Sequence, residues 1–218
     1  MSFDAILFDN DGVLVDTEAL YFRANREVLA GIGVALDEAQ YVELFLRTGR
    51  GAWHLAEVAG HDGAAVHRLR AARDRTYATL VAEGDVTMPG AGAVVAALAA
   101  RYRLAIVTSS DPEPFARTHA RTGLLGHFEL VLTREHYRLS KPDPEPYLVA
   151  VARLGVPPAR CLVIEDSERG LAAAKAAGLA CWVIPSGLTR GGRFDGADAV
   201  LADLRAAARR LLAPAGVS

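Results

Sequence analysis

The sequence has little lysine, little cysteine and no long hydrophobic run, and each shortage narrows what the protein can be. Its only cysteines are Cys161 and Cys181, so neither a disulfide framework nor a zinc site built on cysteine clusters is expected. No uncharged apolar stretch approaches the ~20 residues that cross a bilayer, and no basic segment followed by an apolar one begins the chain. The sequence therefore predicts a cytoplasmic protein that binds no membrane.

The charges nearly balance, with 24 basic and 26 acidic residues among 218 and a formal net charge of −2. Proteins that bind nucleic acid need a strongly basic surface, so no nucleic-acid partner is expected. An anionic small molecule would have to be bound by a few local groups. Lys141 and Lys175 are the only lysines, which makes a lysine in a rigid loop a candidate for such a group.

Short apolar runs rich in Val, Ile and Leu alternate with alanine-rich helical stretches. Such runs are typical of strands buried on both faces of a parallel sheet, and the alternation predicts an α/β fold with helices flanking that sheet. The expected strands are residues 5–8, 104–107, 130–132, 162–164 and 181–184. The expected helices around them are 91–100, 113–122, 146–154, 169–177 and one after Leu204.

About ninety residues separate the first expected strand from the second, far more than an ordinary connection needs. Helical patterns fill this gap, at residues 19–30, 37–46 and 64–81. We therefore expect an α/β core made of residues 1–16 and 85–218, and a small helical domain of residues 17–84 inserted after the first strand.

An acidic pair, Asp9 and Asp11, follows the first expected strand. Residues two apart in an extended segment point to the same side, so the two carboxylates should converge. Carboxylates this close repel each other unless a cation binds them or one stays protonated. Either state suits phosphoryl transfer, in which one carboxylate attacks phosphorus and the other acts as acid and then base. Asp, Asn and Gly residues also favour a simple turn, so the residues at the other strand ends must show whether this segment is a catalytic site or only a turn.

Two further segments carry groups that could bind a phosphoryl group. Thr108 and Ser109 follow the strand at 104–107, where their hydroxyls and amides could hold phosphoryl oxygens or cap the next helix. Lys141 lies in a loop bracketed by prolines and could supply the fixed cation that phosphoryl transfer needs. The alternative is a solvated surface lysine.

A second acidic pair, Glu165 and Asp166, follows the strand at 162–164. Two carboxylates where a buried strand ends are unfavourable unless a cation or hydrogen bonds compensate them, although Asp166 could instead cap the next helix. Mg²⁺ prefers oxygen ligands, so Asp9, the backbone carbonyl of Asp11 and Asp166 would make a partial shell for it.

These four segments, in this order, resemble the motifs of haloacid dehalogenase superfamily phosphatases with a helical cap inserted after the first strand. The resemblance implies a Rossmann-like core and Mg²⁺-dependent hydrolysis of a phosphomonoester through an aspartyl phosphate. It implies that Asp9 is the nucleophile and Asp11 the acid and base. Thr108 and Lys141 would hold the phosphoryl group. The metal set would be Asp9, Asp11 and Asp166, with Glu165 as a ligand or as its support.

Within that superfamily the chain looks most similar to β-phosphoglucomutase-like and phosphoglycolate phosphatase-like proteins. The mutases have a histidine where this chain has Tyr21, so a phosphatase of a sugar phosphate or a phosphoglycolate-like metabolite comes first and a phosphosugar mutase second. Five residues are expected to contact the substrate, although His54 could instead pack within the cap. They are Ser109, Arg47, Thr48, Arg50 and His54.

Two rivals from other classes use the same residue types. A signalling receiver domain would carry its phosphorylated aspartate at a strand end about fifty residues after the acidic pair, where only Asp62 stands, between helical segments. An inactive binding protein would keep the fold without the chemistry, yet all the charged groups are present. We expect an enzyme that acts as a monomer or a weak dimer on a small phosphate ester.

Overall fold

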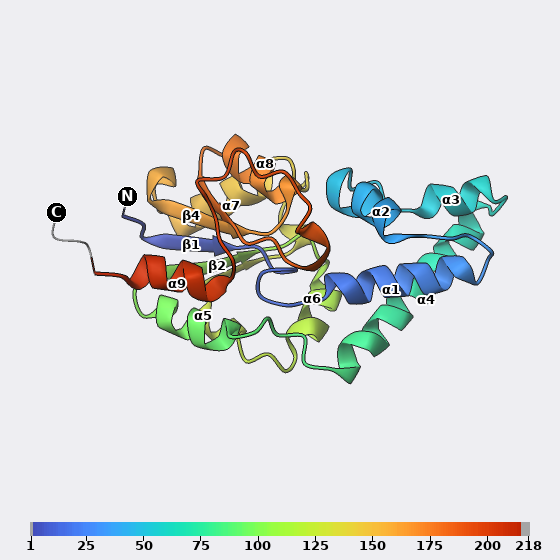
Figure 1. Cartoon of the computed structure of the whole chain (residues 1–218), viewed down its shortest axis with the longest axis horizontal. Coiled ribbons are helices and arrows are strands. Elements are labelled where there is room, and N and C mark those ends of the chain that lie inside the picture. The colour runs from blue at the N-terminus through green and yellow to red at the C-terminus, as the bar shows by residue number, and fades with distance from the viewer. Residues whose placement is uncertain (1, 215–218) are drawn as a thin grey trace.

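The computed structural model describes residues 2–214 and contains a six-stranded parallel sheet (Figure 1). The strand order is β3-β2-β1-β4-β5-β6. The strands are β1 (Ala5–Phe8), β2 (Arg103–Val107), β3 (Leu130–Leu132), β4 (Cys161–Glu165), β5 (Ala180–Val183) and β6 (Ala199–Val200). The predicted α/β fold is confirmed, and the predicted strands differ from β1 to β5 by at most one residue at either end.

The central strand β1 explains why the site forms where it does. β1 pairs with β2 on one side and β4 on the other, and Ile6 aligns with both Leu104 and Leu162. Its four side chains are fully buried and alternate between two apolar clusters on opposite faces of the sheet. Because these strands are parallel, their carboxyl ends meet at one edge, where open α/β sheets bind ligands.

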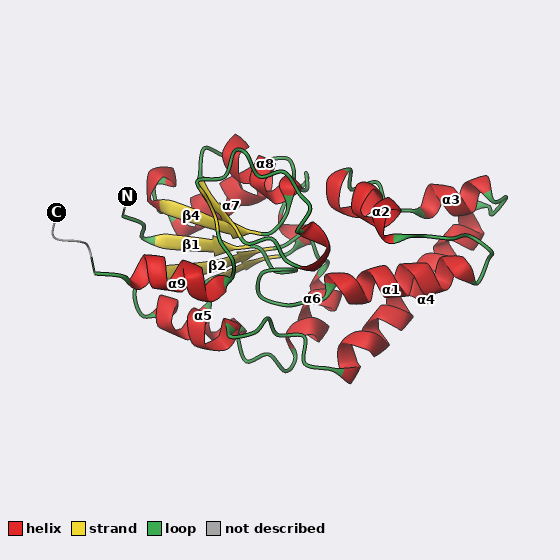
Figure 2. Cartoon of the chain, in the orientation of Figure 1, coloured by secondary structure: helices red, strands yellow, loops and turns green. Residues whose placement is uncertain are grey.

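Helices cover both faces of the sheet (Figure 2). Their bounds are α5 (Ala91–Ala99), α6 (Pro112–His119), α7 (Glu145–Leu154), α8 (Glu168–Ala176) and α9 (Leu204–Leu212), with 3₁₀ turns η2 (Leu125–His127), η3 (Arg134–His136), η4 (Pro158–Arg160) and η5 (Gly187–Thr189). Apolar side chains of α7 and α8 pack on one face, and those of α5, α6 and α9 pack on the other. This two-sided cover accounts for the apolar runs of the strands.

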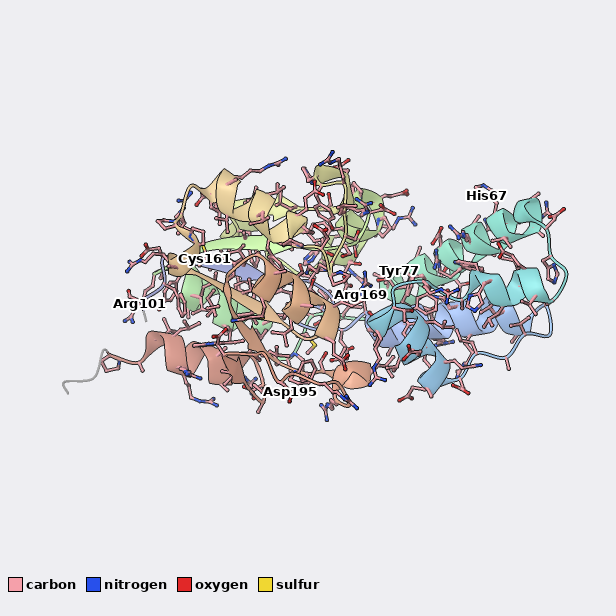
Figure 3. The ribbon with its side chains drawn as sticks, turned by 90° about the horizontal axis from the view of Figure 1, so that it is seen from above. His67, Tyr77, Arg101, Cys161, Arg169 and Asp195 are labelled. Carbon is pink, nitrogen blue, oxygen red and sulfur yellow. The ribbon has the colours of Figure 1, made fainter. Side chains whose placement is uncertain are left out.

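The segment between β1 and α5 is helical. Its elements are α1 (Glu18–Ala30), α2 (Glu38–Tyr41), the π-helical turn η1 (Val42–Arg47), α3 (Trp53–Val58) and α4 (Gly63–Glu83). α1 and α4 pack against each other, and the segment has its own apolar cluster around Leu29, Tyr41 and Trp53. Along α4, Tyr77 lies near the junction with the sheet and His67 lies toward the far end (Figure 3).

Two features of this segment differ from the sequence-based prediction. The helix expected at 37–46 is α2 followed by the wider turn η1, in which the backbone N–H of Thr48 bonds to the carbonyl of Glu43 at 3.0 Å. The short helix α3 was not expected, because its six residues are too few to show a helical period.

Cys161 and Cys181 are both buried and unpaired thiols. Within residues 2–214, no helix combines the length and the apolar character that a bilayer crossing demands.

Candidate active site

The ends of β1 and β4 and the loop before α7 bring the predicted charged residues together. The ammonium of Lys141 lies 2.6 Å from Asp9 Oδ1 and 2.7 Å from Glu165 Oε1. Asp9, Glu165 and Asp166 each place a carboxylate oxygen within 4.8 Å of the other two. One cation thus contacts two carboxylates, with a third close to both, at the edge of the sheet that the strand topology favours for ligands.

Lys141 is held in a fixed position rather than exposed to solvent. Its side chain is only 5% exposed, and its ammonium also donates to the carbonyl of Val107 at 2.9 Å and lies 4.8 Å from the centre of the Tyr147 ring. Burial by itself would lower the pKa of Lys141, but the charges of Asp9 and Glu165 raise it above its ordinary value. The group therefore stays charged. The surface-lysine alternative does not describe Lys141, whereas Lys175 is partly exposed and pairs with Asp198.

Both oxygens of Glu165 are used by donors of the protein. Oε1 accepts from Tyr147 at 2.6 Å as well as from Lys141, and Oε2 accepts from the Ser167 hydroxyl and the following backbone N–H, each at 3.1 Å. Burial opposes ionisation, yet Lys141 and these hydrogen bonds hold the pKa of Glu165 below its ordinary value. A Cβ at Gly170 would lie 1.9 Å from this carboxylate, so glycine is required there. The geometry suits a support for the site better than a direct ligand.

Asp166 is buried beside the hydroxyls of Thr189 and Ser186, which lie 3.2 and 3.4 Å from its Oδ2. Burial, and then the charges of Asp9 and Glu165, raise the pKa of Asp166 well above its ordinary value. Burial and Glu165 also raise the pKa of Asp9, against the opposing pull of Lys141. These carboxylates carry more negative charge than Lys141 neutralises, and a hard divalent cation would compensate the excess.

Asp11 borders the same cavity but is not one of the three clustered carboxylates. Its Oδ1 accepts from the Thr17 hydroxyl, and its Oδ2 accepts from the Ser110 hydroxyl at 3.1 Å. The turn that carries it depends on Gly12, whose φ is +83° and whose added Cβ would lie 2.1 Å from Asp166 Oδ2. The Asp11 side chain is thus held by two hydroxyls and is not part of the clustered carboxylates.

The three residues after β2 divide between the interior and the cavity. Thr108 is buried, and its hydroxyl accepts from the backbone N–H of Ser110 at 3.1 Å. Ser109 and Ser110 border the cavity. Asp111 occupies the N-cap position of α6 without a side-chain capping bond. The structure therefore gives the hydroxyl of Thr108 a role in shaping this loop, and leaves Ser109 and Ser110 toward the cavity.

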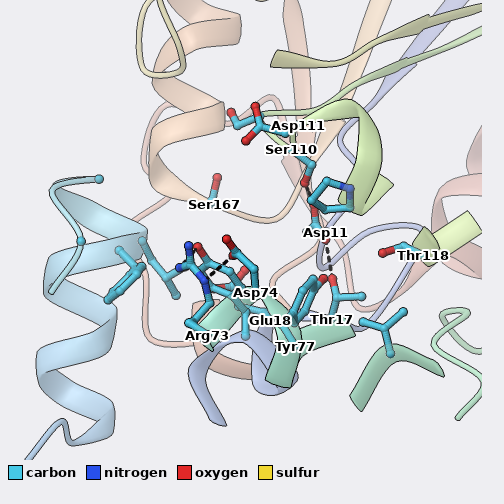
Figure 4. Close-up of a pocket in the computed structure, with 18 of the residues that line it drawn as sticks. Asp11, Thr17, Glu18, Arg73, Asp74, Tyr77, Ser110, Asp111, Thr118 and Ser167 are labelled. Carbon is cyan, nitrogen blue, oxygen red and sulfur yellow. Dashed lines mark hydrogen bonds and ion pairs between the residues drawn. The ribbon is translucent and has the colours of Figure 1, made fainter. Parts of the chain in front are cut away.

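A cavity of about 920 Å³ lies between the sheet edge and the inserted helices (Figure 4). From the sheet side it is bordered by Asp9, Asp11, Ser109, Lys141 and Asp166. From the inserted helices it is bordered by residues of α1, α4 and the loop before α3. These carboxylate and ammonium groups therefore face a space that is large enough for a small metabolite and is bordered on its far side by the insert.

The four residues of the insert that were predicted to contact the substrate do not all border the cavity. Arg50 borders the cavity, but Arg47, Thr48 and His54 do not. Arg47 lies 3.6 Å from Glu168, the first residue of α8, and the Thr48 hydroxyl donates to backbone carbonyls of η1. The wider turn η1 and the glycines on both sides of Arg50 direct these neighbouring side chains to different sides.

The inserted helices also contribute cavity residues that the sequence analysis did not single out. Arg73, Asp74 and Tyr77 lie on the face of α4 that borders the cavity (Figure 4). Their helical spacing places them on one face, but the sequence does not show which face of the helix turns to the cavity. Glu18 on α1 accepts a hydrogen bond from the buried Tyr41 hydroxyl. Burial raises the pKa of Glu18 to about 7, with Asp11 adding to the shift and Tyr41 opposing it.

Comparison with known proteins places the chain in a family. The family model described as haloacid dehalogenase-like hydrolase matches residues 3–178. Protein CbbY of Cereibacter sphaeroides is 37% identical over 216 residues, covering 91% of both chains. Fructose-1-phosphate phosphatase YqaB of Escherichia coli (strain K12) is 30% identical over 177 residues, covering 80% of this chain and 92% of the relative.

A solved structure agrees with these sequence relatives. A mutant of CbbY from Rhodobacter sphaeroides, in complex with xylulose-(1,5)bisphosphate, superimposes with a TM-score of 0.77 and 32% identity. The match covers 93% of this chain and 95% of that one, so it includes the sheet and the inserted helices together.

Proposed function

The chain belongs to the haloacid dehalogenase-like hydrolases, and we propose that it is a Mg²⁺-dependent phosphomonoester hydrolase that acts through an aspartyl phosphate. The observation that carries this proposal is the contact of the Lys141 ammonium with Asp9 Oδ1 at 2.6 Å, beside two more buried carboxylates. A nucleophile, a fixed cation and a surplus of oxygen ligands are the parts that phosphoryl transfer to a carboxylate needs.

Residues 17–84 would serve as a cap over this site, and residues 1–16 and 85–218 as the core. The cavity supports this division, because residues of both parts border it. A cap that closes over the reacting groups would limit access of bulk water and select the substrate.

The donor set fits Mg²⁺, which takes oxygen ligands and keeps several waters. Asp9 and Asp166 would hold the ion with the backbone carbonyl of Asp11, while Glu165 supports the site through Lys141. When bound, the ion would neutralise charge on the transferring phosphoryl group. It would also favour the ionised form of Asp9, which burial opposes.

The chain's own residues would then carry out two displacements. An Asp9 carboxylate oxygen attacks phosphorus, the bond from phosphorus to the substrate oxygen breaks, and Asp11 gives that oxygen its proton. In the second step Asp11 takes a proton from water, whose oxygen attacks phosphorus and breaks the bond to Asp9. Lys141, Ser109 and the loop shaped by Thr108 would hold the phosphoryl oxygens throughout.

The substrate would be a small phosphorylated metabolite, a sugar phosphate or a phosphoglycolate-like acid. Two relatives support this class: one is named for fructose 1-phosphate, and the other was crystallised with a xylulose bisphosphate. Arg50 at the cavity would contact the part of the substrate away from the reacting phosphate.

Phosphate release tests the proposal. We expect steady hydrolysis of p-nitrophenyl phosphate that stops with EDTA and returns with Mg²⁺, and a loss of at least about 10⁴-fold in Asp9→Asn. Asp195→Asn changes an exposed aspartate that does not border the cavity, so it is the matched control and should keep full activity. Absence of turnover on any phosphate ester would overturn the proposal, and isomerisation of glucose 1-phosphate without free phosphate would replace it with a mutase.

A further inference from the structure

A buried polar chain runs from the interior of the core to Asp11. Asn10 stands between the two reacting aspartates and is only 1% exposed, and His119 on α6 is 5% exposed. His119 Nε2 lies 2.7 Å from Asn10 Oδ1, and Asn10 Nδ2 donates to Asp11 Oδ2 at 3.2 Å. On the other side of the ring, His119 Nδ1 lies 3.0 Å from the Thr122 hydroxyl.

The chemistry of these groups fixes which atom donates at each step. The Asn10 amide N–H donates to Asp11 Oδ2, so the Asn10 carbonyl oxygen faces His119. His119 Nε2 therefore carries a hydrogen, and Nδ1 accepts from the Thr122 hydroxyl. Burial lowers the pKa of His119 to about 4, against the opposing charge of Asp11, so the ring is neutral and keeps this single arrangement near neutral pH.

We propose that Asn10 and His119 are positioning residues that hold the Asp11 carboxyl group at the angle from which it protonates the leaving oxygen. This inference rests on the proposed function, in which Asp11 is the acid and base. The other two donors to Asp11, Thr17 and Ser110, border the cavity. The Asn10 amide reaches Asp11 from the buried side, and His119 prevents that amide from rotating.

Substrates whose leaving groups differ in basicity can distinguish a positioning role of Asn10 and His119 from a merely structural one. General acid catalysis matters more when the leaving oxygen is a stronger base, and it contributes about 10²–10⁴-fold in enzymes. p-Nitrophenyl phosphate needs little protonation of its leaving group, whereas phenyl phosphate, of almost the same size, needs more. A misdirected acid should therefore slow phenyl phosphate selectively, while a general loss of folding should slow both substrates equally.

The experiment compares kcat/KM for these two substrates in Asn10→Leu, His119→Phe and the double variant. We expect phenyl phosphate to lose about 10- to 100-fold and p-nitrophenyl phosphate to lose about tenfold less. His119→Phe alone leaves the Asn10 carbonyl oxygen without its donor, so its urea midpoint should fall by about 1 M. The double variant replaces both polar partners with apolar groups and should recover much of that stability but none of the selectivity.

Conservative and distant variants complete the test. His119→Gln keeps an N–H donor near the position of Nε2 and should stay within about threefold of the wild type. His127→Ala changes an exposed histidine and should have no effect. Equal losses on both substrates, or recovery of activity together with stability in the double variant, would overturn the inference while leaving the proposed function intact. A wild-type protein without phosphatase activity would overturn both.

Discussion

The two walls of the cavity are built differently. On the sheet side, Asp9, Lys141 and Glu165 are buried and joined by contacts of 2.6 and 2.7 Å. On the side of the inserted helices Arg73 pairs with Asp74, but Arg50 is exposed, and the part of the chain that the structure describes gives Arg50 no ion pair. Buried charges held by hydrogen bonds suit a chemical step that needs one geometry. An exposed charge without an ion pair suits binding of the rest of the substrate. The contrast suggests that chemistry belongs to the sheet and selectivity to the insert.

The strongest test of this contrast removes the cation from the sheet side. Lys141→Met leaves the buried Asp9 and Glu165 carboxylates without their partner, so we expect the free energy of unfolding to fall by about 3–5 kcal/mol in urea titrations with EDTA present. Activity should fall by at least about 10²-fold, because the fixed cation for the phosphoryl group is lost.

The second lysine provides the matched control. Lys175 pairs with Asp198 at 2.8 Å on the surface, where both side chains are more than a third exposed. Lys175→Met should therefore cost less than about 1 kcal/mol and leave activity unchanged. Equal destabilisation in both variants would show that the buried cluster is no more dependent on its cation than a surface pair.

The sequence predicted the sheet side well because strand ends follow simple rules. A buried parallel strand shows as an apolar run, and the polar residues after it must lie at the carboxyl edge, which placed Asp9 and Asp166 near each other. Lys141 was predicted instead from its proline-bracketed loop. The same reasoning could not reveal His119. Its partner Asn10 is 109 positions earlier in the chain, and only the packing of α6 brings the two together.

The cap side was harder to predict because small changes in backbone path redirect its side chains. Arg47 and Arg50 are three residues apart, yet one faces Glu168 and the other the cavity. The π-helical turn η1 and the positive φ values of Gly49 and Gly51 lie between or beside them. A π-helical turn leaves no periodic pattern in the sequence, so the direction in which each arginine points can be seen only in the folded structure.

Those two arginines offer the next test of the contrast. Arg50→Ala should raise KM for a phosphorylated sugar by about 10-fold or more with little change in kcat, because one charge-assisted contact to the substrate is lost. Arg47→Ala, which removes an exposed ion pair away from the cavity, should change KM by less than about twofold. Steady-state kinetics on both variants measure the difference. A large KM effect from Arg47 alone would reverse the assignment of the two side chains.

The smallest expected effect concerns Glu18, a partly buried acid on the side of the inserted helices. Burial raises the pKa of Glu18 from 4.5 to about 7, so the folded protein holds this proton more tightly than the unfolded chain does. The free energy of unfolding should therefore decrease as the pH rises between about 4.5 and 7, and this contribution should be constant above that range.

Glu18→Gln tests whether ionisation of Glu18 destabilises the folded protein. The variant keeps an oxygen that accepts from Tyr41 but cannot ionise, so its stability relative to the wild type should increase from pH 5 to pH 8. Because the carboxyl borders the cavity and water reaches part of it, we expect a gain of about 1–2 kcal/mol. Urea titrations across this pH range measure the gain, with Glu83→Gln at the exposed end of α4 as the control. If the two variants behave alike, the cap wall tolerates an ionised Glu18 at no cost, and the contrast with the cation-dependent sheet side becomes sharper.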